Sequence, residues 1–507
     1  MFKRVIRGIV LFGFAVTLCG IASLFSSCCS CNGSNCNSGG GCGLEWYETQ
    51  YVSASSAPQN TPANGLSGAP SASTDARFIA FSSVASNLVS PATPGDQQVY
   101  LRDTCGGSTA PSGCQAKTIL VSVNASGQAV ANCFGSPSIN FRPGISGDGR
   151  YVVFESNGCD LGFGTNEATI WQIYVRDTCT GPNGPGTLSG CTPNTVAITH
   201  SSLPSRHPTI SQDGIYVAFQ SNATDLPADG QGNPPAGTQI YVADLSICEG
   251  SSGIRTCNPH IVLVSQTASG AQASSGKIEA GNTNAPQVSP SGRFVVFTSN
   301  NQNIGGGTLG TSPMQLFVAD SCMSAGSGIP GCTVQTLGPF SSANADVLSP
   351  SIDNSARFLA YASTISGTQQ IFAVDDCTVP KAQPGCTPST KLVSTTLSGT
   401  AGNLGSDSPF MAPNGGAVAF HSLATNFIQV GTVTNGDVFV SSNCFGNPSG
   451  CVTGAVGLDT FNCKLPNNAV IQPVFDVNSD QLAFASSATN LDSSVSAPGV
   501  FLAKTGQ

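Results

Sequence analysis

Cysteine is the residue type in this sequence whose spacing most clearly indicates chemistry. Short apolar runs end on a cysteine at six places, as in QVYLRDTC (98–105) and QIYVRDTC (172–179), and a second cysteine follows 7 to 12 residues later. Zinc sites favour cysteines roughly two to four residues apart with further ligands nearby, and these loops offer no third or fourth ligand. The spacing therefore predicts six disulfides, each closing one loop. The predicted pairs are Cys105–Cys114, Cys179–Cys191, Cys248–Cys257, Cys322–Cys332, Cys377–Cys386 and Cys444–Cys451.

The remaining cysteines have no such regular partner. Cys133 and Cys159 flank two expected strands and are candidates to pair with each other, whereas Cys463 has no mate in its own repeat and is expected near the N-terminal segment. The tract CCSCNGSNCNSGGGCG (28–43) has spacings that would also suit a small metal cluster. We interpret it instead as a flexible Gly/Ser tether with local disulfides. We predict no metal and no cofactor for the chain.

The first 27 residues have the composition of an export signal. Three basic residues precede an uncharged, mostly apolar stretch (8–25), and LFSSC follows at 24–28. Small residues directly before a cysteine resemble the lipobox of bacterial lipoproteins. In that family the cysteine thiol receives a diacylglycerol and becomes the mature N-terminus, so the resemblance implies lipidation of Cys28. An uncleaved membrane anchor and a plain secretory signal are the alternatives, and all three would export the rest of the chain.

The overall composition is that of an uncharged, strand-rich protein. Charged residues make up 9% of the 507 positions, against about 25% in ordinary globular chains. Hydrophobic residues make up 40% and recur in short runs, which argues against disorder. The net charge of −9 comes without a basic patch, so nucleic acid is not an expected partner. Twenty-one cysteines indicate an oxidising compartment.

A second motif recurs seven times. Copies read PGISGDGRYVVFES (143–156), PTISQDGIYVAFQS (208–221) and PQVSPSGRFVVFTS (286–299). Asp, Asn and Gly suit a tight turn, and the β-branched and aromatic run that follows suits a strand with one buried face. With the strand that ends on cysteine and a fourth strand such as TILVS (118–122), each repeat predicts the four antiparallel strands of a propeller blade. The aromatic landmarks of the seven copies are Phe81, Phe154, Phe219, Phe297, Tyr361, Phe420 and Phe484.

The two ends of the chain are expected to close the ring. GVFLAKTG (499–506) is the third strand of the last repeat, and WYETQYVSAS (46–55) is an orphan strand before the first repeat. If the N-terminal strand completes the last blade, no long edge is left unpaired. We therefore predict an all-β, seven-bladed propeller of four-stranded antiparallel blades over residues 46–507. It follows a signal peptide at 1–27 and a tether at 28–45.

Catalytic motifs are missing from the sequence. The four histidines form no His-Glu-x-x-His pattern, and there is no Gly-x-Ser-x-Gly elbow. His421 stands where other copies have Ser, Glu, Gln, Thr or Ala and is expected to face solvent. A recurrent arginine, such as Arg77, and a recurrent aspartate, such as Asp103, are interpreted as an ion pair within each blade. The sequence therefore predicts a protein that is not an enzyme.

One group of residues breaks the repeat symmetry where the innermost strands would line a central channel. The residue before the blade proline varies among the copies, and Arg142, Arg206 and His207 bring positive or titratable groups together there. These three residues form a candidate site for an anion or a carboxylate. A solvated channel mouth without a ligand is the alternative.

The blade pattern P-x-[I/V]-S-x-D-G-R-x-[V/I]-x-F-x-S, followed by I-Y-V-x-D, resembles the WD40-like repeats of TolB-type propellers. The copies at 143–156, 208–221 and 286–299 carry the resemblance most closely. It implies a propeller with a protein partner, since TolB is periplasmic and binds a peptidoglycan-associated lipoprotein and colicins. Similar propellers also precede the hydrolase domain of prolyl-oligopeptidase-type enzymes, whose nucleophile elbow this sequence lacks.

We therefore predict a binding platform without catalytic activity. It would be exported and lipid-anchored at the outer membrane or cell surface, with the periplasmic side as an alternative, and its partner would be an envelope or surface protein. A carbohydrate-binding or glycan-active propeller is one alternative and would need exposed aromatic side chains such as Trp46 and Trp171. A structural surface component is another.

Overall fold

The computed structural model describes most of the chain from residue 46 to residue 505. The predicted signal, Cys28 and the tether lie outside the described residues. None of the helical segments in the described part is long and apolar enough to cross a membrane. The described range has gaps at 94, 132–139, 162–169, 247–258, 268, 274–277, 280–285, 302, 305–312, 325–326, 342–344, 378, 380–383, 428–434, 443–444, 446–454, 458–465, 493–494 and 496.

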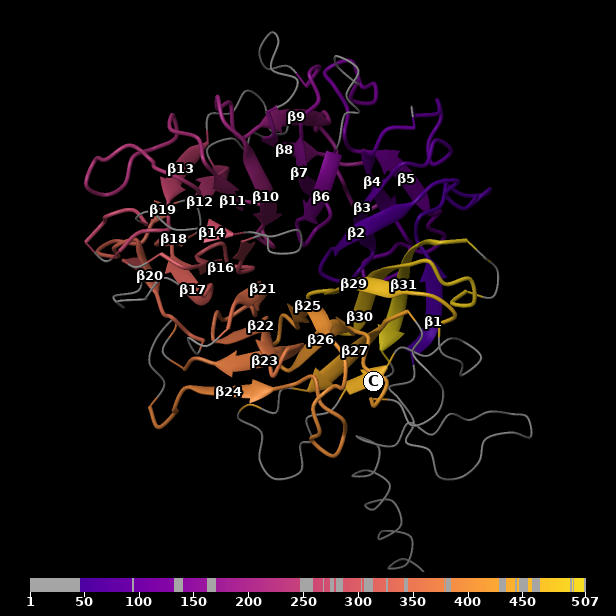
Figure 1. Ribbon diagram of the computed structural model, residues 1–507. Coiled ribbons are helices and arrows are strands. Elements are labelled where there is room, and N and C mark those ends of the chain that lie inside the picture. The colour runs from indigo at the N-terminus through magenta and orange to yellow at the C-terminus, as the bar shows by residue number, and fades with distance from the viewer. Residues whose placement is uncertain are drawn as a thin grey trace, which may run out of the picture.

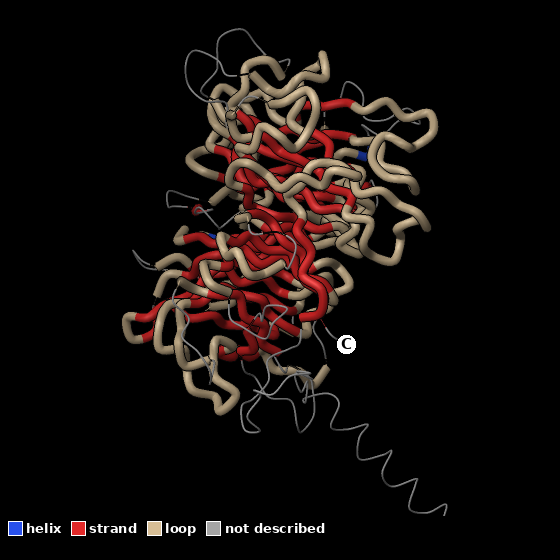
Figure 2. The backbone as a smooth tube through the Cα atoms, turned by 90° about the vertical axis from the view of Figure 1, so that its right-hand side faces the viewer, coloured by secondary structure: helices blue, strands red, loops and turns tan. Residues whose placement is uncertain are grey.

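Seven antiparallel sheets surround a central axis, and strands and loops make up nearly all of the described chain (Figures 1 and 2). Blade 1 is β2 (Ser67–Ala72), β3 (Phe78–Ser83), β4 (Gln98–Asp103) and β5 (Lys117–Leu120). Blade 2 is β6 (Asn140–Ile145), β7 (Tyr151–Ser156), β8 (Gln172–Asp177) and β9 (Asn194–Ala197). Blade 3 is β10 (Ser205–Ile210), β11 (Tyr216–Ser221), β12 (Gln239–Asp244) and β13 (His260–Leu263).

The second half of the ring repeats this order. Blade 4 has β16 (Phe294–Ser299), β17 (Gln315–Asp320) and β20 (Gln335–Leu337), with a first strand in two pieces, β14 (Ile278–Glu279) and β15 (Gln287–Val288). Blade 5 is β21 (Val347–Ile352), β22 (Phe358–Ile365), β23 (Thr368–Asp375) and β24 (Ser389–Leu392). Blade 6 is β25 (Ser406–Met411), β26 (Ala417–Ser422), β27 (Asp437–Ser442) and β28 (Ala455–Gly457). A small hairpin, β18 (Met323–Ser324) with β19 (Ser327–Gly328), lies in a cysteine loop.

Blade 7 is built from both ends of the chain, as predicted. It holds β29 (Val470–Phe475), β30 (Gln481–Ser486) and β31 (Gly499–Thr505), and β1 (Trp46–Tyr51) pairs antiparallel with β31 as its outer strand. The Tyr51 ring meets the Phe501 ring edge-on at 5.1 Å. The Tyr51 hydroxyl donates to the carbonyl of Pro498 at 3.0 Å. The all-β, seven-bladed fold and its closure by an N-terminal strand are thus confirmed.

An aromatic pair marks the core of every blade. The seven landmark residues of the second strands each stack on an aromatic residue of the third strand, with ring centroids 5.2 to 6.0 Å apart. Stacked rings of this kind add to the apolar area that they bury. The pairs are Phe81–Tyr100, Phe154–Tyr174, Phe219–Tyr241, Phe297–Phe317, Tyr361–Phe372, Phe420–Phe439 and Phe484–Phe501.

The turn after the first strand also explains why blades 2, 3, 4 and 6 have glycine there. Gly292 has a φ of +75°, and a Cβ at this position would lie 1.8 Å from Cδ2 of Tyr216 in the preceding blade. Gly214 has a φ of +77°, and a Cβ there would lie 2.5 Å from Cδ2 of Tyr151 in the preceding blade. Glycine therefore supplies the left-handed turn and also lets neighbouring blades approach closely.

The inner strands are joined from blade to blade. At one end of the channel, the backbone N–H of Thr74 donates to Gly147 at 2.9 Å, that of Gly147 to Gln212 at 2.7 Å and that of Gln212 to Pro290 at 3.1 Å. Side chains just after the blade proline make a second set of bonds, as when Ser71 Oγ accepts from Ile145 N. These bonds hold the seven inner strands in place around the channel.

Candidate functional site

The two faces of the ring carry different turns and connections. We call the face with the turns between first and second strands and the cysteine loops the turn face. The opposite face carries the connections between second and third strands and between successive blades, and we call it the loop face. The strand order of each blade places these segments.

An arginine, an aspartate and a disulfide form one unit on the turn face. Arg77 Nε and Nη2 donate to the two carboxylate oxygens of Asp103 at 3.1 and 2.9 Å, and the backbone N–H of Cys105 donates to the same carboxylate at 3.0 Å. The guanidinium also stacks over the Phe78 ring at 4.6 Å. Arg150–Asp177, Arg293–Asp320 and Arg357–Asp375 repeat this arrangement. The interpretation of the recurrent charges as an ion pair within the blade is correct for these four blades.

Blade 7 has the two charges in the opposite order along the chain. Asp480 precedes β30 at the arginine position, and Lys504 lies opposite Gln481 at the aspartate position. Burial, followed by a hydrogen bond with Asp480, raises the pKa of the adjacent Asp476 to about 8. Blade 7 therefore differs from the other blades in its charged residues as well as in being built from both ends of the chain.

Four of the six expected cysteine pairs are disulfide-bonded, namely Cys105–Cys114, Cys179–Cys191, Cys322–Cys332 and Cys377–Cys386. Cys248–Cys257 and Cys444–Cys451 lie outside the described residues, as do Cys133 and Cys463. Cys159 is disulfide-bonded to a partner that also lies outside them.

The aspartate of each turn-face unit lies close to the disulfide in a grouping that would also suit a metal ion. In these groups both cysteines are already bonded to each other, and the carboxylate accepts from an arginine. The units therefore stabilise the turn face, and a thiolate metal site is not available in them while the disulfides are formed.

The loop face carries the exposed apolar side chains. Every large hydrophobic residue that is well exposed in the described part of the chain lies in one of its connections or, for Ile365 in β22 and Ile471 in β29, in a strand end that adjoins it. Leu66 is the most exposed, at 71%, and it adjoins Val84 through a backbone hydrogen bond of 3.0 Å. The full set is Leu66, Val84, Leu203, Ile365, Leu397, Leu404, Leu423 and Ile471. Neighbouring exposed apolar side chains, as in the Leu66–Val84 pair, are typical of an interaction surface.

Carboxylates accompany these apolar residues. The described loop-face segments hold six aspartates that are exposed or half-buried, against one arginine, Arg206, with a described side chain. The aspartates are Asp96, Asp160, Asp225, Asp346, Asp407 and Asp492. The described loop face is therefore both apolar and acidic.

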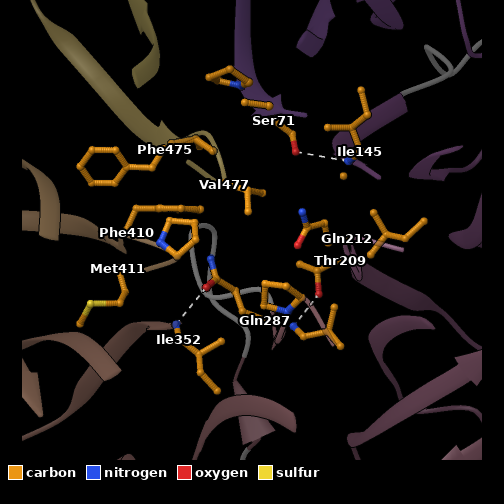
Figure 3. Close-up of a pocket in the computed structure, with 18 of the residues that line it drawn as sticks. Ser71, Ile145, Thr209, Gln212, Gln287, Ile352, Phe410, Met411, Phe475 and Val477 are labelled. Carbon is orange, nitrogen blue, oxygen red and sulfur yellow. Dashed lines mark hydrogen bonds between the residues drawn. The ribbon is translucent and has the colours of Figure 1, made fainter. Parts of the chain in front are cut away.

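The central channel contains a cavity of about 580 Å³, formed by the first strands of the blades (Figure 3). Prolines from most blades line it, together with apolar side chains such as Ile145, Ile352, Met411 and Phe475. Arg206 is the one charged residue among the described residues that line this cavity.

The structure describes the side chains of two of the three residues predicted to bind an anion, and only one of these two side chains lines the cavity. Arg206 lines the cavity, and its guanidinium lies over the Trp171 ring at 4.2 Å. His207 is buried with a φ of +59°, and its backbone N–H donates to Glu155 at 2.6 Å, so its side chain is not part of the lining. The side chain of Arg142 lies outside the described residues. The anion site itself stays a prediction.

Sequence reasoning missed Glu155, which organises this group. Its side chain is fully buried, and it accepts from Arg206 Nη2 at 3.1 Å as well as from the His207 backbone. A signal was present, because Glu155 is the one carboxylate at a strand position that holds Ser, Gln, Thr, Ala or His in the other blades. Trp171 has a cation on its ring, which leaves less of its surface for stacking on a sugar.

His421 does not face solvent as expected. Its side chain is 12% exposed, and Nδ1 pairs with Asp407 Oδ1 at 3.1 Å. Burial alone would raise the pKa of Asp407, but the hydrogen bond from His421 and its charge together lower it. The pair joins the first and second strands of blade 6.

No family model and no curated protein matches the chain. Among solved structures, TolB from Acinetobacter baumannii is 14% identical, with 89% of this chain and 81% of that chain covered and a TM-score of 0.34. Oligogalacturonate lyase from Vibrio parahaemolyticus is 11% identical, with 92% and 99% covered and a TM-score of 0.43. An acylaminoacyl peptidase from Pyrococcus horikoshii is 11% identical, with 86% and 51% covered and a TM-score of 0.41.

In its blade repeat the chain is similar to the TolB-type propellers. Its matches nevertheless include TolB proteins, a lyase and peptidases, so the likeness is one of propeller architecture and carries no activity. The chain spans about half the length of the peptidase it matches. The disulfides of the turn face indicate an oxidising, exported location.

Proposed function

We propose that this protein is an exported, non-catalytic binding platform whose loop face docks a protein partner. One observation carries the proposal: the exposed large hydrophobic residues of the described chain lie in loop-face connections or in strand ends that adjoin them, whereas the turn face is occupied by ion pairs and disulfides. Apolar side chains that are exposed and do not pack in the core of the protein indicate a surface that a partner covers.

The charge of this face narrows the kind of partner. Six exposed or half-buried aspartates accompany the apolar residues in the described segments. A complementary surface would present apolar side chains together with lysine or arginine, and the opposite charges would speed association and make it sensitive to salt. An envelope or surface protein with such a patch is the proposed partner.

The proposal includes a membrane tether. Lipidation of Cys28 would hold the ring at a membrane surface through residues 28–45, with the outer membrane or cell surface as the proposed location. A mass measurement on the N-terminal peptide of the mature protein tests this directly. A peptide that starts at Cys28 and carries a diacylglycerol supports the tether, and an unmodified N-terminus overturns it.

Docking is tested by crosslinking and affinity capture from the native envelope, read by quantitative mass spectrometry. The loop-face variant combines Leu66→Ser with Leu404→Ser, because both side chains are well exposed. The control combines Ser112→Ala with Gln115→Ala, two exposed positions in a turn-face cysteine loop. We expect one recurrent protein with the wild type and the control, with recovery at least about tenfold lower for the loop-face variant. Equal recovery by both variants would refute docking through the loop face.

A further inference from the structure

The wall of the central cavity presents much apolar surface, and several of its side-chain oxygens are already engaged. Ser71 Oγ and Thr209 Oγ1 accept from backbone N–H groups of the next blade at 3.3 and 3.2 Å. Gln287 Oε1 accepts from Ile352 N at 3.3 Å (Figure 3). Gln472 Oε1 accepts from Ala69 N at 2.8 Å. The prolines between them have no N–H to donate. Prolines and apolar side chains therefore supply most of the exposed wall, which favours an apolar body over a sugar-like ligand.

The rim of the cavity has a cation in a fixed orientation. The Arg206 guanidinium is held between the Trp171 ring, 4.2 Å away, and Glu155, whose Oε1 accepts from Nη2 at 3.1 Å. Glu155 is itself fixed by the backbone N–H of His207. A guanidinium has five N–H donors, and the described contacts of Arg206 use one of them. Nε is buried, but the side chain as a whole is 36% exposed, so a ligand would approach the guanidinium through its Nη groups.

We infer that the cavity binds an amphiphile with an apolar body and an anionic, carboxylate-like end. The body would occupy the proline-lined channel and the carboxylate would accept from Arg206, with both groups already in place before binding. The cavity volume of about 580 Å³ lies in the range of roughly 300–1,000 Å³ that small-molecule sites occupy. A cationic amphiphile would meet a like charge at the rim. Arg206 lies at the loop-face end of the channel, but the cavity lining includes none of the exposed hydrophobic residues of the proposed docking surface.

Three probes test the chemical class. Sodium dodecanoate, dodecyltrimethylammonium chloride and sodium acetate are titrated into the purified exported protein by calorimetry, all below micelle-forming concentrations. We expect one dodecanoate per chain, at least about tenfold weaker binding of the cationic probe and no detectable heat from acetate. These results would show that both the apolar body and the negative end are recognised.

Variants test the location. Arg206→Gln should weaken dodecanoate binding about tenfold, because it removes a charged donor. Arg293→Gln is the matched control, since Arg293 also pairs with a carboxylate, also stacks on an aromatic ring and is 31% exposed, but lies on the turn face. Val474→Trp places a large side chain in the channel from a half-buried lining position and should abolish binding without touching Arg206.

Several outcomes would overturn the proposed channel site. Dodecanoate binding that Val474→Trp leaves unchanged would place the ligand outside the channel and overturn the inference. Equal affinity of wild type and Arg206→Gln, equal affinity for the cationic probe, or no binding by the wild type would do the same. Retained dodecanoate binding in the Leu66→Ser/Leu404→Ser variant, with loss of protein capture, would show that the channel and the loop face act independently.

Discussion

Replacing Arg77 by methionine should destabilise the propeller far more than the same replacement at Arg357. Both arginines donate two hydrogen bonds to a strand-three aspartate and stack on the next aromatic ring. They differ in solvent access, because the Arg77 side chain is 2% exposed and the Arg357 side chain is 28% exposed. Methionine keeps much of the apolar stem, so the loss comes from the guanidinium, which in Arg77 also donates to the Thr109 carbonyl at 2.8 Å.

The expected magnitude follows from what remains around each carboxylate. Without Arg77, Asp103 is buried with the Cys105 N–H at 3.0 Å as its remaining described backbone donor. Removing one partner of a buried pair costs about 3–5 kcal/mol. Water can reach the site vacated by Arg357, and a pair with that exposure is worth about 1 kcal/mol or less. We therefore expect a gap of roughly 2–4 kcal/mol between the two variants.

Urea unfolding followed by tryptophan fluorescence and by circular dichroism measures this gap, once the two transitions are shown to coincide. The double variant Arg77→Met/Asp103→Leu is the control, because it removes both charges and should recover at least half of the loss. Equal losses for Arg77→Met and Arg357→Met would refute the argument from burial. A double variant less stable than Arg77→Met would show that the ion pair is not the main contribution.

Three further changes test other parts of the fold. Cys179→Ser with Cys191→Ser should lower the free energy of unfolding by about 3 kcal/mol, because it frees a short loop in the unfolded chain; an unchanged urea midpoint would contradict this. Burial, together with a neighbouring aspartate, raises the pKa of Asp476 to about 8, so its contribution to stability is complete below pH ~4 and lost as the pH rises towards about 8. Asp476→Asn should flatten that pH dependence, and an unaltered slope would rule out this assignment. Gly292→Ala should destabilise more than Gly113→Ala, because both have φ near +75° but only the former Cβ would meet a neighbouring ring; equal midpoints would show that close packing does not matter there.

The fold was predictable because each blade repeats its own local signals. The turn residues, the alternating apolar strand and the aromatic landmark all occur within a few residues of one another, so one copy is enough to suggest the blade. Ring closure was also visible, because WYETQYVSAS (46–55) lacked a partner near it and the last repeat lacked a fourth strand. The structure pairs these two segments as β1 and β31.

The channel was harder to predict because side-chain direction depends on backbone conformation. Arg206 and His207 are adjacent, yet the positive φ of His207 and the buried Glu155 place one side chain in the cavity wall and leave the other out of it. Glu155 accepts from both residues across a distance of about fifty positions in sequence. Spacing alone does not encode that contact. For the same reason the pairing of His421 with Asp407, across a hairpin, replaced the expected solvent exposure.

Variants on the two faces are expected to affect different properties, stability on the turn face and partner binding on the loop face, which makes the docking proposal testable. Turn-face variants remove buried pairs and disulfides, so they are expected to change stability. Leu66 is 71% exposed, and substitution at such a position usually changes stability by no more than about 0.5 kcal/mol. The loop face is held by hydrogen bonds that do not involve the side chains of its leucines, as where Asn64 Nδ2 donates to Ser86 Oγ at 2.9 Å and Asn403 Nδ2 to Thr425 Oγ1 at 2.8 Å. A loop-face leucine variant that unfolds like wild type but fails to capture a partner would therefore report a lost contact and not a damaged ring.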